Sequence, residues 1–223
     1  MLIFEKEKIH QIKNVLRKKP NEKVIFFDET GHQYLSLLKE IKKDFILAQI
    51  IETKLPKKEP KIKIWLYQSL LKRKNFEMVL KYSVSLGVEK IIPLISERTI
   101  IRKVEEKKLK RWQKIIIESC QQSQRIKIPE ISPPQNFLEA VKSSKAQAKL
   151  IAHPSASNLL KKILKKEFLS LAIFVGPEGG FSEKEITFAK KYGFFDFKIQ
   201  DLILRSEIAP LVILSQILFY YLN

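Results

Sequence analysis

The stretch that decides the fold is Leu171-Ala172-Ile173-Phe174-Val175-Gly176-Pro177-Glu178-Gly179-Gly180-Phe181-Ser182-Glu183-Lys184-Glu185. Its first five residues are apolar, which is typical of a strand buried on both faces of a parallel sheet. Ser182 and Glu185 have the spacing of a capping box, so we predict a helix that begins there and ends near Gly193. The glycines between strand and helix let a ligand approach the main chain. The stretch therefore predicts a strand whose carboxyl end presents backbone groups to a ligand.

The spacing of these glycines excludes several familiar ligand-binding loops. It is not the Gly-x-Gly-x-x-Gly of dinucleotide-binding folds, and no Lys-Ser/Thr pair follows it as in a P-loop. The acidic Gly-x-Gly signature of the common Rossmann-like methyltransferases is also missing. The alternative is that the glycines serve only the geometry of a tight turn. Spacing alone leaves the ligand open.

Strand and helix patterns alternate on both sides of this stretch. Strands are predicted at 62–67, 90–95, 150–152 and 171–175, helices at 75–86 and 105–121, and a further unit at 156–166. Pro133 and Pro134 end the segment that follows the second helix. The inward faces of the two helices carry Phe76, Val79, Leu80 and Ser83, with Gly87 as a stop, and then Trp112, Ile115, Ile116 and Cys120. This alternation favours a mostly parallel sheet covered by helices on both faces.

The first part of the chain has a different pattern of short, β-rich runs. Strands are predicted at 24–27, 34–41 and 45–51, with a turn at 28–31 and a short helix at 9–17. Strands this short favour a small barrel. The polar, proline-flanked stretch 55–61 is predicted to be a linker between two domains.

The charge of the chain points to a polyanionic partner. There are 42 Lys and Arg residues against 24 Asp and Glu, a formal net charge of +18. Like charges repel in a compact protein, whereas cations placed beside phosphates release condensed counterions, so we predict nucleic-acid binding. The alternative is a compositional drift toward lysine. Cys120 is the single cysteine, the start lacks a secretory pattern, and the apolar run 211–222 is shorter than the roughly 20 residues that span a bilayer. We therefore expect a cytoplasmic protein.

Two motifs together make the chain recognisable. Gly176 to Ser182, read with Leu204-Arg205-Ser206-Glu207-Ile208-Ala209, resembles the ribosomal RNA small subunit methyltransferase E family, part of the SPOUT superfamily of trefoil-knotted methyltransferases. The resemblance covers nearly the whole chain. Further matching segments are Val15-Leu16-Arg17, Leu86-Gly87-Val88, Ile92-Pro93-Leu94, Ser96-Glu97-Arg98, Trp112-Gln113-Lys114, Gln122 with Arg125, and Ile128-Pro129-Glu130-Ile131.

The resemblance implies a fold and an activity. Residues 1–58 would form a PUA-like RNA-binding β-barrel domain, and residues 62–223 an α/β SPOUT methyltransferase domain with a mostly parallel sheet and a C-terminal trefoil knot. The family methylates N3 of a specific uridine of 16S ribosomal RNA, in the decoding region of the small subunit. It uses S-adenosylmethionine and works as a homodimer. The expected partners are therefore that RNA and a second copy of the chain, with no membrane.

The resemblance also implies site residues. The cofactor would lie against the backbone of the glycine loop and of the segment around Leu204, that is, against Val175, Gly176, Pro177, Glu178, Gly179, Gly180, Ile199, Leu204, Ser206 and Ala209. We hypothesise that Arg205, with Arg125, stabilises negative charge on the uridine oxygens as the N3 proton leaves, and that Glu207 orients Arg205 or accepts a hydrogen bond. The alternative for Arg205 is an ion pair with Glu207 and no contact with the substrate. RNA contacts are expected from Arg17, Arg98, Gln122 and Arg125.

The cysteine and the histidines are assigned mostly structural roles. Methylation at N3 needs no covalent attack on the ring, so Cys120, on an apolar helix face, is expected in the core. His153 either contacts the cofactor or simply ends a strand, and His10 is expected at a helix cap or on the surface. The three histidines are scattered and have no cysteine cluster beside them, so no metal site is predicted.

A few positions depart from the family pattern and keep alternatives open. Gln200 stands where the family has glycine, Leu202 where it has arginine, Ile208 where threonine is common, and Lys81-Tyr82 replaces a Gln-Lys pair. The first change would reshape the wall beside the cofactor, and the second removes a partner for phosphate or carboxylate. Three alternatives remain: a SPOUT enzyme that acts on a ribose 2′-hydroxyl or another base, a ribosome assembly factor without activity, and a basic metabolic enzyme that binds no RNA.

Overall fold

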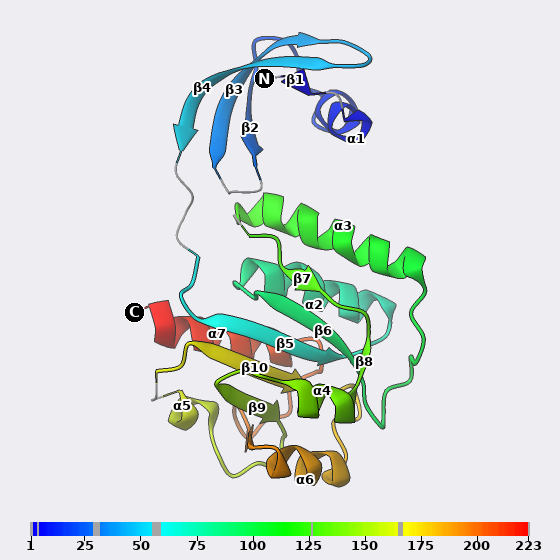
Figure 1. Ribbon diagram of the computed structural model, residues 1–223, viewed down its shortest axis with the longest axis vertical. Coiled ribbons are helices and arrows are strands. Elements are labelled where there is room, and N and C mark those ends of the chain that lie inside the picture. Colours follow the sequence, from blue (N-terminus) through cyan, green and yellow to red (C-terminus); the bar gives the residue numbers. More distant parts are fainter. Residues whose placement is uncertain are drawn as a thin grey trace. The chain divides into compact units, whose positions relative to one another are not determined.

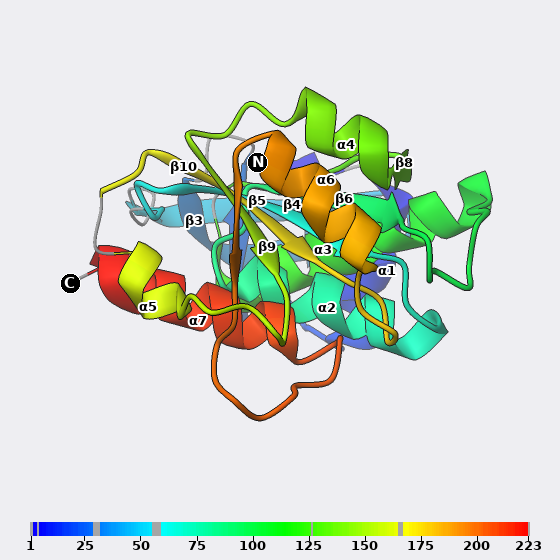
Figure 2. The same ribbon diagram turned by 90° about the horizontal axis from the view of Figure 1, so that it is seen from below.

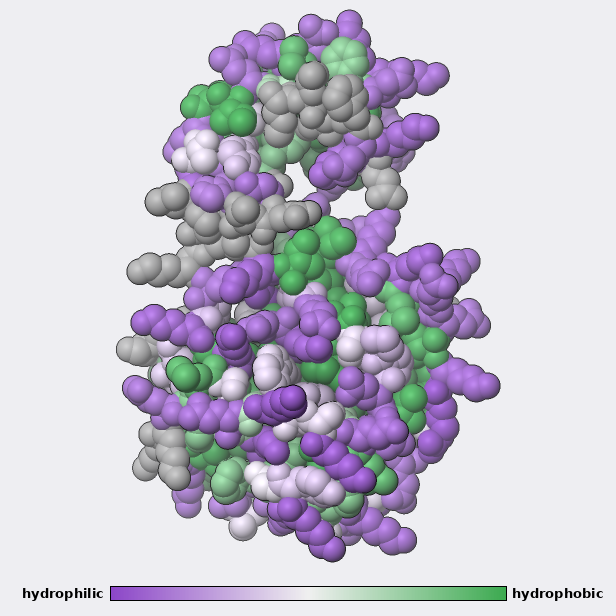
Figure 3. All heavy atoms as spheres, viewed as in Figure 1, coloured by the Kyte–Doolittle hydropathy of each residue, from purple (hydrophilic) through white to green (hydrophobic). Residues whose placement is uncertain are grey.

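The computed structural model describes residues 2–3, 5–28, 32–54, 59–125, 127–164 and 167–222. The chain divides into two units, Met1–Lys58 and Glu59–Asn223 (Figure 1). Part of the predicted turn (residues 29–31) and part of the predicted linker (residues 55–58) lie outside the described residues. Hydrophilic side chains cover most of the face seen in Figure 3, in keeping with the high lysine content.

The N-terminal unit is built on a four-stranded antiparallel sheet in the order β1-β4-β3-β2. Its strands are β1 (Leu2–Ile3), β2 (Lys23–Phe27), β3 (Gln33–Ile41) and β4 (Ile46–Lys54). The three strands predicted from the sequence are therefore present. Among the described residues of this unit, no pairing joins the edge strands β1 and β2.

The helical segment of this unit differs from the prediction. A helix was expected at 9–17, but the structure has α1 (Lys6–His10), which continues as a π-helical turn, η1 (Gln11–Val15). Ile9 and Ile12 are its buried residues, and they pack with Leu38, Ile46 and Ala48 into a small core. His10 is exposed, and its Nδ1 lies 2.8 Å from Asn14 Nδ2.

The C-terminal unit is built on a seven-stranded sheet in which every pairing is parallel. The order is β11-β9-β10-β5-β6-β7, and β8 pairs with β6 beyond the end of β7. The strands are β5 (Lys63–Ser69), β6 (Lys90–Ile95), β7 (Glu130–Ile131), β8 (Gln135–Asn136), β9 (Ala148–Ala152), β10 (Ser170–Val175) and β11 (Phe194–Phe197). The carboxyl ends of β5, β6, β9, β10 and β11 therefore meet along one edge of the sheet.

Alternate residues of each central strand feed two separate cores. On β10, Leu171, Ile173 and Val175 belong to one core, and Ala172 and Phe174 to the other. The first core includes residues of α2 (Arg73–Ser85), α3 (Glu106–Ser123) and α7 (Ala209–Leu222). The second includes residues of α4 (Phe137–Ser143) and α6 (Glu183–Lys191). The two groups of helices lie on opposite faces of the sheet (Figure 2), as the alternating pattern predicted.

The predicted helices differ in how well they are confirmed. On α2 the four residues predicted to face inward are all buried, and Gly87 has a positive φ of +78° just beyond its end. On α3, Trp112, Ile116 and Cys120 are buried and Ile115 is partly buried. The unit expected at 156–166 contains only the short α5 (Leu160–Ile163) over its described residues. Helix α4 was not predicted.

Candidate active site

The glycine loop between β10 and α6 is a tight turn that only particular residues can form. The amide of Gly180 donates a hydrogen bond to the carbonyl of Pro177 at 2.9 Å, which closes the turn. A Cβ on Gly176 would lie 3.0 Å from backbone atoms of Gly180 and Phe181, so the fold leaves no room for a side chain there. Gly180 has φ +67°, which other residues rarely adopt.

The start of α6 is fixed by the predicted capping box and by a second segment of the chain. The Ser182 hydroxyl accepts from the Glu185 amide, and the Glu185 carboxylate accepts from the Ser182 amide at 2.9 Å. The amide of Glu97 donates to the same carboxylate at 2.8 Å, and the Ser182 hydroxyl donates to the Glu97 carboxylate at 2.7 Å. The turn after β6 therefore holds the far end of the glycine loop.

A pocket opens beside the glycine loop, at the carboxyl edge of the sheet. Nine of the ten residues predicted to bind the cofactor line it, and Gly179 does not. The loops after β9 and β11 form the other walls. The lining residues that the sequence prediction did not include are Ala152, His153, Pro154, Phe197, Lys198, Gln200, Leu202 and Ile203. Of these, His153, Gln200 and Leu202 had been placed near the cofactor by their sequence positions, whereas Ala152 and Phe197 become neighbours only because β9 pairs with β11.

The wall from Ile199 to Leu204 presents main-chain groups. Among the described residues, no backbone N–H or C=O of this segment forms a hydrogen bond with another backbone group. Lys198, just before it, is tied to Asp201 by a 2.8 Å ion pair, which shapes the start of the segment. The pocket thus has one wall with main-chain donors and acceptors available to a ligand.

Arg205 and Glu207 follow this wall and have opposite surroundings. The Arg205 side chain is 85% exposed, whereas that of Glu207 is 10% exposed. Arg205 Nη1 lies 3.9 Å from Glu207 Oε1, and the Ser206 hydroxyl donates to Glu207 Oε2 at 3.4 Å. The ion pair given above as an alternative is therefore present but long. It leaves the guanidinium open to a ligand.

His153 and Cys120 take different positions. His153 lines the pocket, and its Nε2 lies 3.6 Å from Glu183 Oε1. Cys120 is buried in the core, as predicted, and burial raises the pKa of its thiol to about 11. A thiol held in this neutral form is a poor nucleophile.

The residues predicted to contact RNA lie on different elements of the two units. Arg17 is exposed in the N-terminal unit, and Gln122 is exposed on α3 of the other unit. Arg98 instead contacts the glycine loop, because its Nη1 donates to the carbonyl of Gly179 at 2.7 Å. Arg98 thus lies behind the pocket wall rather than in the pocket.

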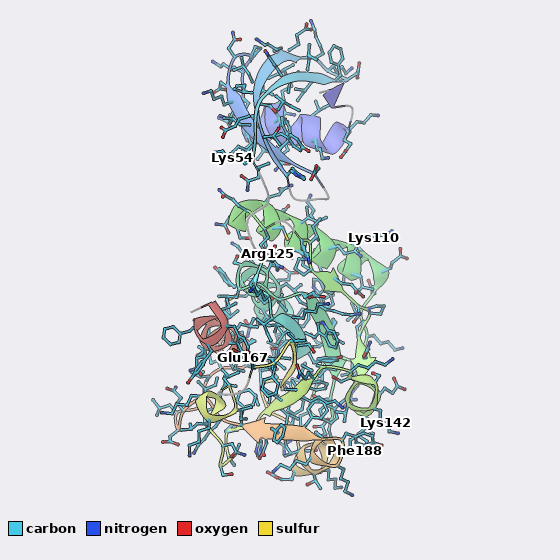
Figure 4. The ribbon with its side chains drawn as sticks, turned by 60° about the vertical axis from the view of Figure 1, so that its left-hand side comes forward. Lys54, Lys110, Arg125, Lys142, Glu167 and Phe188 are labelled. Carbon is cyan, nitrogen blue, oxygen red and sulfur yellow. The ribbon has the colours of Figure 1, made fainter. Side chains whose placement is uncertain are left out.

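Arg125 has a structural environment that argues against the catalytic role suggested above. Its side chain is 8% exposed and forms a 2.7 Å ion pair with Glu59. Its Nη1 also donates to the carbonyls of Val84 and Val88, at 3.1 and 2.6 Å. The Arg125 side chain is labelled in Figure 4. Since Arg125 does not line the pocket and its donors are occupied, we withdraw it from the candidate catalytic residues.

Comparison with known proteins agrees with this architecture. A family model described as an RNA methyltransferase domain matches residues 57–218, and one described as an RNA methyltransferase PUA domain matches residues 4–51. Ribosomal RNA small subunit methyltransferase E of Buchnera aphidicola (Schizaphis graminum) is 32% identical over 96% of this chain and 89% of its own length. The chain belongs to the ribosomal RNA small subunit methyltransferase E family.

Other members of the ribosomal RNA small subunit methyltransferase E family give the same result. The Mesomycoplasma hyopneumoniae protein is 38% identical over 76% of this chain and 75% of its own length. The Neisseria gonorrhoeae protein, crystallised with S-adenosylmethionine, has a TM-score of 0.90 at 32% identity, covering 99% of this chain and 92% of that one. Membership confirms the predicted fold class, which is a parallel α/β methyltransferase domain preceded by a small antiparallel PUA domain. It also confirms the predicted enzyme class, a methyltransferase of small-subunit ribosomal RNA.

Two of the departures from the methyltransferase E family pattern that the sequence suggests lie on the pocket wall. Gln200 and Leu202 both line the pocket. Leu202 and Ile203 are 76% and 80% exposed, so this wall presents apolar side chains outward where the family pattern has an arginine.

Within the described ranges, no helix is long and apolar enough to cross a membrane, and no cluster of His, Cys, Asp and Glu is suited to a metal ion.

Proposed function

We propose that this protein methylates N3 of a specific uridine in the decoding region of 16S ribosomal RNA, with S-adenosylmethionine as the methyl donor. The observation that carries the proposal is the pocket beside the glycine loop, which nine of the ten predicted cofactor-binding residues line. Family membership and the cofactor-bound Neisseria gonorrhoeae relative support it. The net charge of +18 supports an RNA substrate.

The lining of the pocket fits S-adenosylmethionine. Val175, Pro177, Phe197, Leu204 and Ala209 offer apolar surface for an adenine ring. The main-chain groups of the segment 199–204 have no backbone partners among the described residues and are available to hydrogen-bond polar atoms of the ligand. These two features would hold the cofactor between the glycine loop and the segment before Arg205. When bound, the cofactor supplies an activated methyl group.

The protein's own task in this reaction is to bind the base and to stabilise charge. N3 lies on the pairing edge of uracil, so the uridine must be unpaired before it can enter the site. Loss of the N3 proton places negative charge on the two flanking oxygens, and the exposed Arg205 guanidinium is suited to bind them. Glu207, buried 3.9 Å away, orients that guanidinium.

The proposal extends to the knot and the homodimer of the family. The strand order is compatible with a knot, because β11 pairs with β9 rather than with β10, and the chain must pass β9 after α6 to reach it. The exposed Leu202 and Ile203 support a contact with a second copy. We propose that both partners, the small subunit and the second copy, are met in the cytoplasm, where ribosomal subunits are assembled. Light scattering on the purified protein tests the dimer, and a single-chain mass would contradict it.

The experiment that tests the function is methyl transfer to small ribosomal subunits from cells that lack this gene. We expect one labelled nucleotide in 16S RNA, and mass mapping should identify it as a uridine methylated on N3. A labelled ribose would contradict the assignment of the base. Absence of transfer from protein that binds the cofactor would favour an assembly factor without activity.

A further inference from the structure

We propose that Arg98 is a positioning residue for the cofactor, which acts by fixing the peptide unit between Gly179 and Gly180. This inference rests on the proposed function, because it assumes that the pocket beside the glycine loop binds S-adenosylmethionine. It assigns to Arg98 a different role from the RNA contact expected from the sequence. Three features support this role. Hydrogen bonds hold the peptide unit at both ends, glycines flank it, and Arg98 extends from a hydrogen-bonded turn.

The peptide unit between Gly179 and Gly180 is held at both ends. Its N–H donates to the Pro177 carbonyl at 2.9 Å, and its C=O accepts from Arg98 Nη1 at 2.7 Å. Because a peptide unit is planar, these two hydrogen bonds together fix the direction of the whole plane. The second bond is charge-assisted, and such bonds are stronger than those between neutral groups.

Without Arg98 this peptide would be the most mobile part of the loop. It is flanked by two glycines, which have more conformational freedom than any other residue. Gly180 already lies at φ +67°, and a Cβ built on it would meet no atom within 4 Å. A mobile peptide would have to be ordered when the cofactor binds, at a cost in affinity.

Arg98 is placed by a turn that is itself strongly hydrogen-bonded. The amide of Ser96 donates to the Thr99 hydroxyl at 2.9 Å, and the amide of Thr99 donates to the Ser96 carbonyl at 3.1 Å. Glu97 on the same turn bonds to Ser182 and Glu185 at the start of α6. The turn 96–99 therefore contacts the glycine loop at Gly179 and at its far end, and it holds the backbone of Arg98 close to the loop.

Arg98 acts on the cofactor only through the loop. Gly176, Pro177, Glu178 and Gly180 line the pocket, but Arg98 does not. Its side-chain carbons would lie 3.4 and 3.6 Å from a Cβ on Gly179, so they pack against the outer side of the loop. Removal of the side chain would thus leave every lining residue in place and change only how firmly the loop is held.

The test compares Arg98→Ala and Arg98→Lys with Arg102→Ala as a matched control. Arg102 lies on the same segment and donates to the Glu97 carbonyl at 2.8 Å, but it makes no bond to the glycine loop among the described residues. Calorimetry with S-adenosylmethionine, without RNA, measures the affinity of each variant. We expect R98A to weaken binding about 5- to 30-fold, the range for a lost charge-assisted hydrogen bond on a partly exposed group. R98K should restore part of the loss, and R102A should stay within about twofold of the unsubstituted protein.

A second measurement separates positioning from other roles. Hydrogen exchange in the cofactor-free protein should be faster at 176–182 in R98A than in R102A, because one end of the peptide is released. Unchanged cofactor affinity in R98A, with RNA affinity lowered more than in R102A, would overturn the inference in favour of an RNA contact. Equal exchange in the two variants would also overturn it. If the unsubstituted protein binds no cofactor, the proposed function fails instead.

Discussion

At the scale of single residues, the three glycines of the loop have three different roles. Gly176 is required by space, because a Cβ there would lie only 3.0 Å from backbone atoms of Gly180 and Phe181. Gly180 is required by its positive φ, and space around it is open. Gly179 has neither constraint, since a Cβ there would meet only the Arg98 side chain, at 3.4 Å. The three glycines look equivalent in the sequence, but they should differ in how well they tolerate substitution.

Alanine substitution at each glycine tests these roles. We expect Gly176→Ala to abolish measurable binding of S-adenosylmethionine, because the loop must rebuild. Gly180→Ala should weaken cofactor binding by about 1–2 kcal/mol, because a residue with a Cβ adopts this left-handed backbone conformation at that cost. Gly179→Ala should change cofactor affinity least, within about threefold, because its Cβ would meet the Arg98 side chain at 3.4 Å, an ordinary van der Waals contact that leaves the Arg98–Gly179 hydrogen bond in place. Calorimetry measures all three, and a G179A variant weaker than G176A would contradict the account.

Arg205 is the residue whose removal should affect chemistry without affecting the fold. Its side chain is 85% exposed and touches Glu207 only at 3.9 Å, so Arg205→Ala should leave the melting temperature and the cofactor affinity unchanged. We expect turnover to fall about 100-fold, the usual effect of removing one group that stabilises developing charge. Single-turnover methyl transfer measures it. Unchanged turnover would leave Arg205 as a partner of Glu207 alone.

At the scale of the elements, the buried Arg125–Glu59 pair joins three segments of the methyltransferase unit. Glu59 lies just before β5, Arg125 lies just after α3, and the carbonyls of Val84 and Val88 belong to the end of α2 and the turn beyond it. Glu59 also accepts from the amide of Lys127 at 3.2 Å. The pair therefore fixes the entry to the central sheet.

Removal of one partner should destabilise the protein without touching the pocket. Arg125→Ala removes the ion-pair partner of the Glu59 carboxylate, which is 17% exposed, and we expect a loss of about 3 kcal/mol in the free energy of unfolding, the lower end of the range for buried pairs. Lys110→Ala is the control, because Lys110, which extends from α3 in Figure 4, forms an exposed pair with Glu106 that should contribute less than about 0.5 kcal/mol. Urea unfolding measures both. A stable R125A variant with reduced methyl transfer would restore Arg125 to the catalytic residues.

The elements that the sequence predicts well are those with a long, regular pattern. On α2 and α3 apolar residues recur at helical spacing, and β10 is apolar after Ser170, so their bounds were predicted to within two residues. Helix α4 has only seven residues and follows two prolines that read as the end of a segment. Its Asn136 cap, which accepts from the amide of Leu138 at 2.9 Å, was a signal that could have revealed it. The π-helical turn η1 has no signature in the pattern of apolar residues.

The same limit applies to the site. The glycine loop and the segment 204–209 were predicted because each is a continuous motif. Ala152 and Phe197 join the pocket because β9 pairs with both β10 and β11, and strand order is not written in a local pattern. The contact between Arg98 and Gly179 spans 81 positions, and the Arg125–Glu59 pair spans 66. Long-range contacts of this kind give Arg98 and Arg125 partners within the protein that their sequence positions did not reveal.

At the scale of the whole molecule, the net charge of +18 should make RNA binding strongly dependent on salt. The C-terminal unit has two cores of its own, so a fragment of residues 59–223 should fold and bind the cofactor. We expect this fragment to bind 16S RNA more weakly, with a shallower slope of log affinity against log salt, because the cations of residues 1–58 are missing. Fluorescence anisotropy over a series of KCl concentrations measures the slopes. Equal slopes for fragment and full chain would contradict a role of the N-terminal unit in RNA binding.

The proposed function and the roles of the loop residues depend on the pocket between the glycine loop and the segment 199–204 being the binding site for S-adenosylmethionine. A calorimetric titration of the purified full-length protein with this compound, repeated with Gly176→Ala, is the decisive measurement. We predict saturable binding of one molecule per chain, which the substitution abolishes while the protein stays folded. Saturable binding that survives in G176A, or no binding to the unsubstituted protein with or without small subunits, would contradict it.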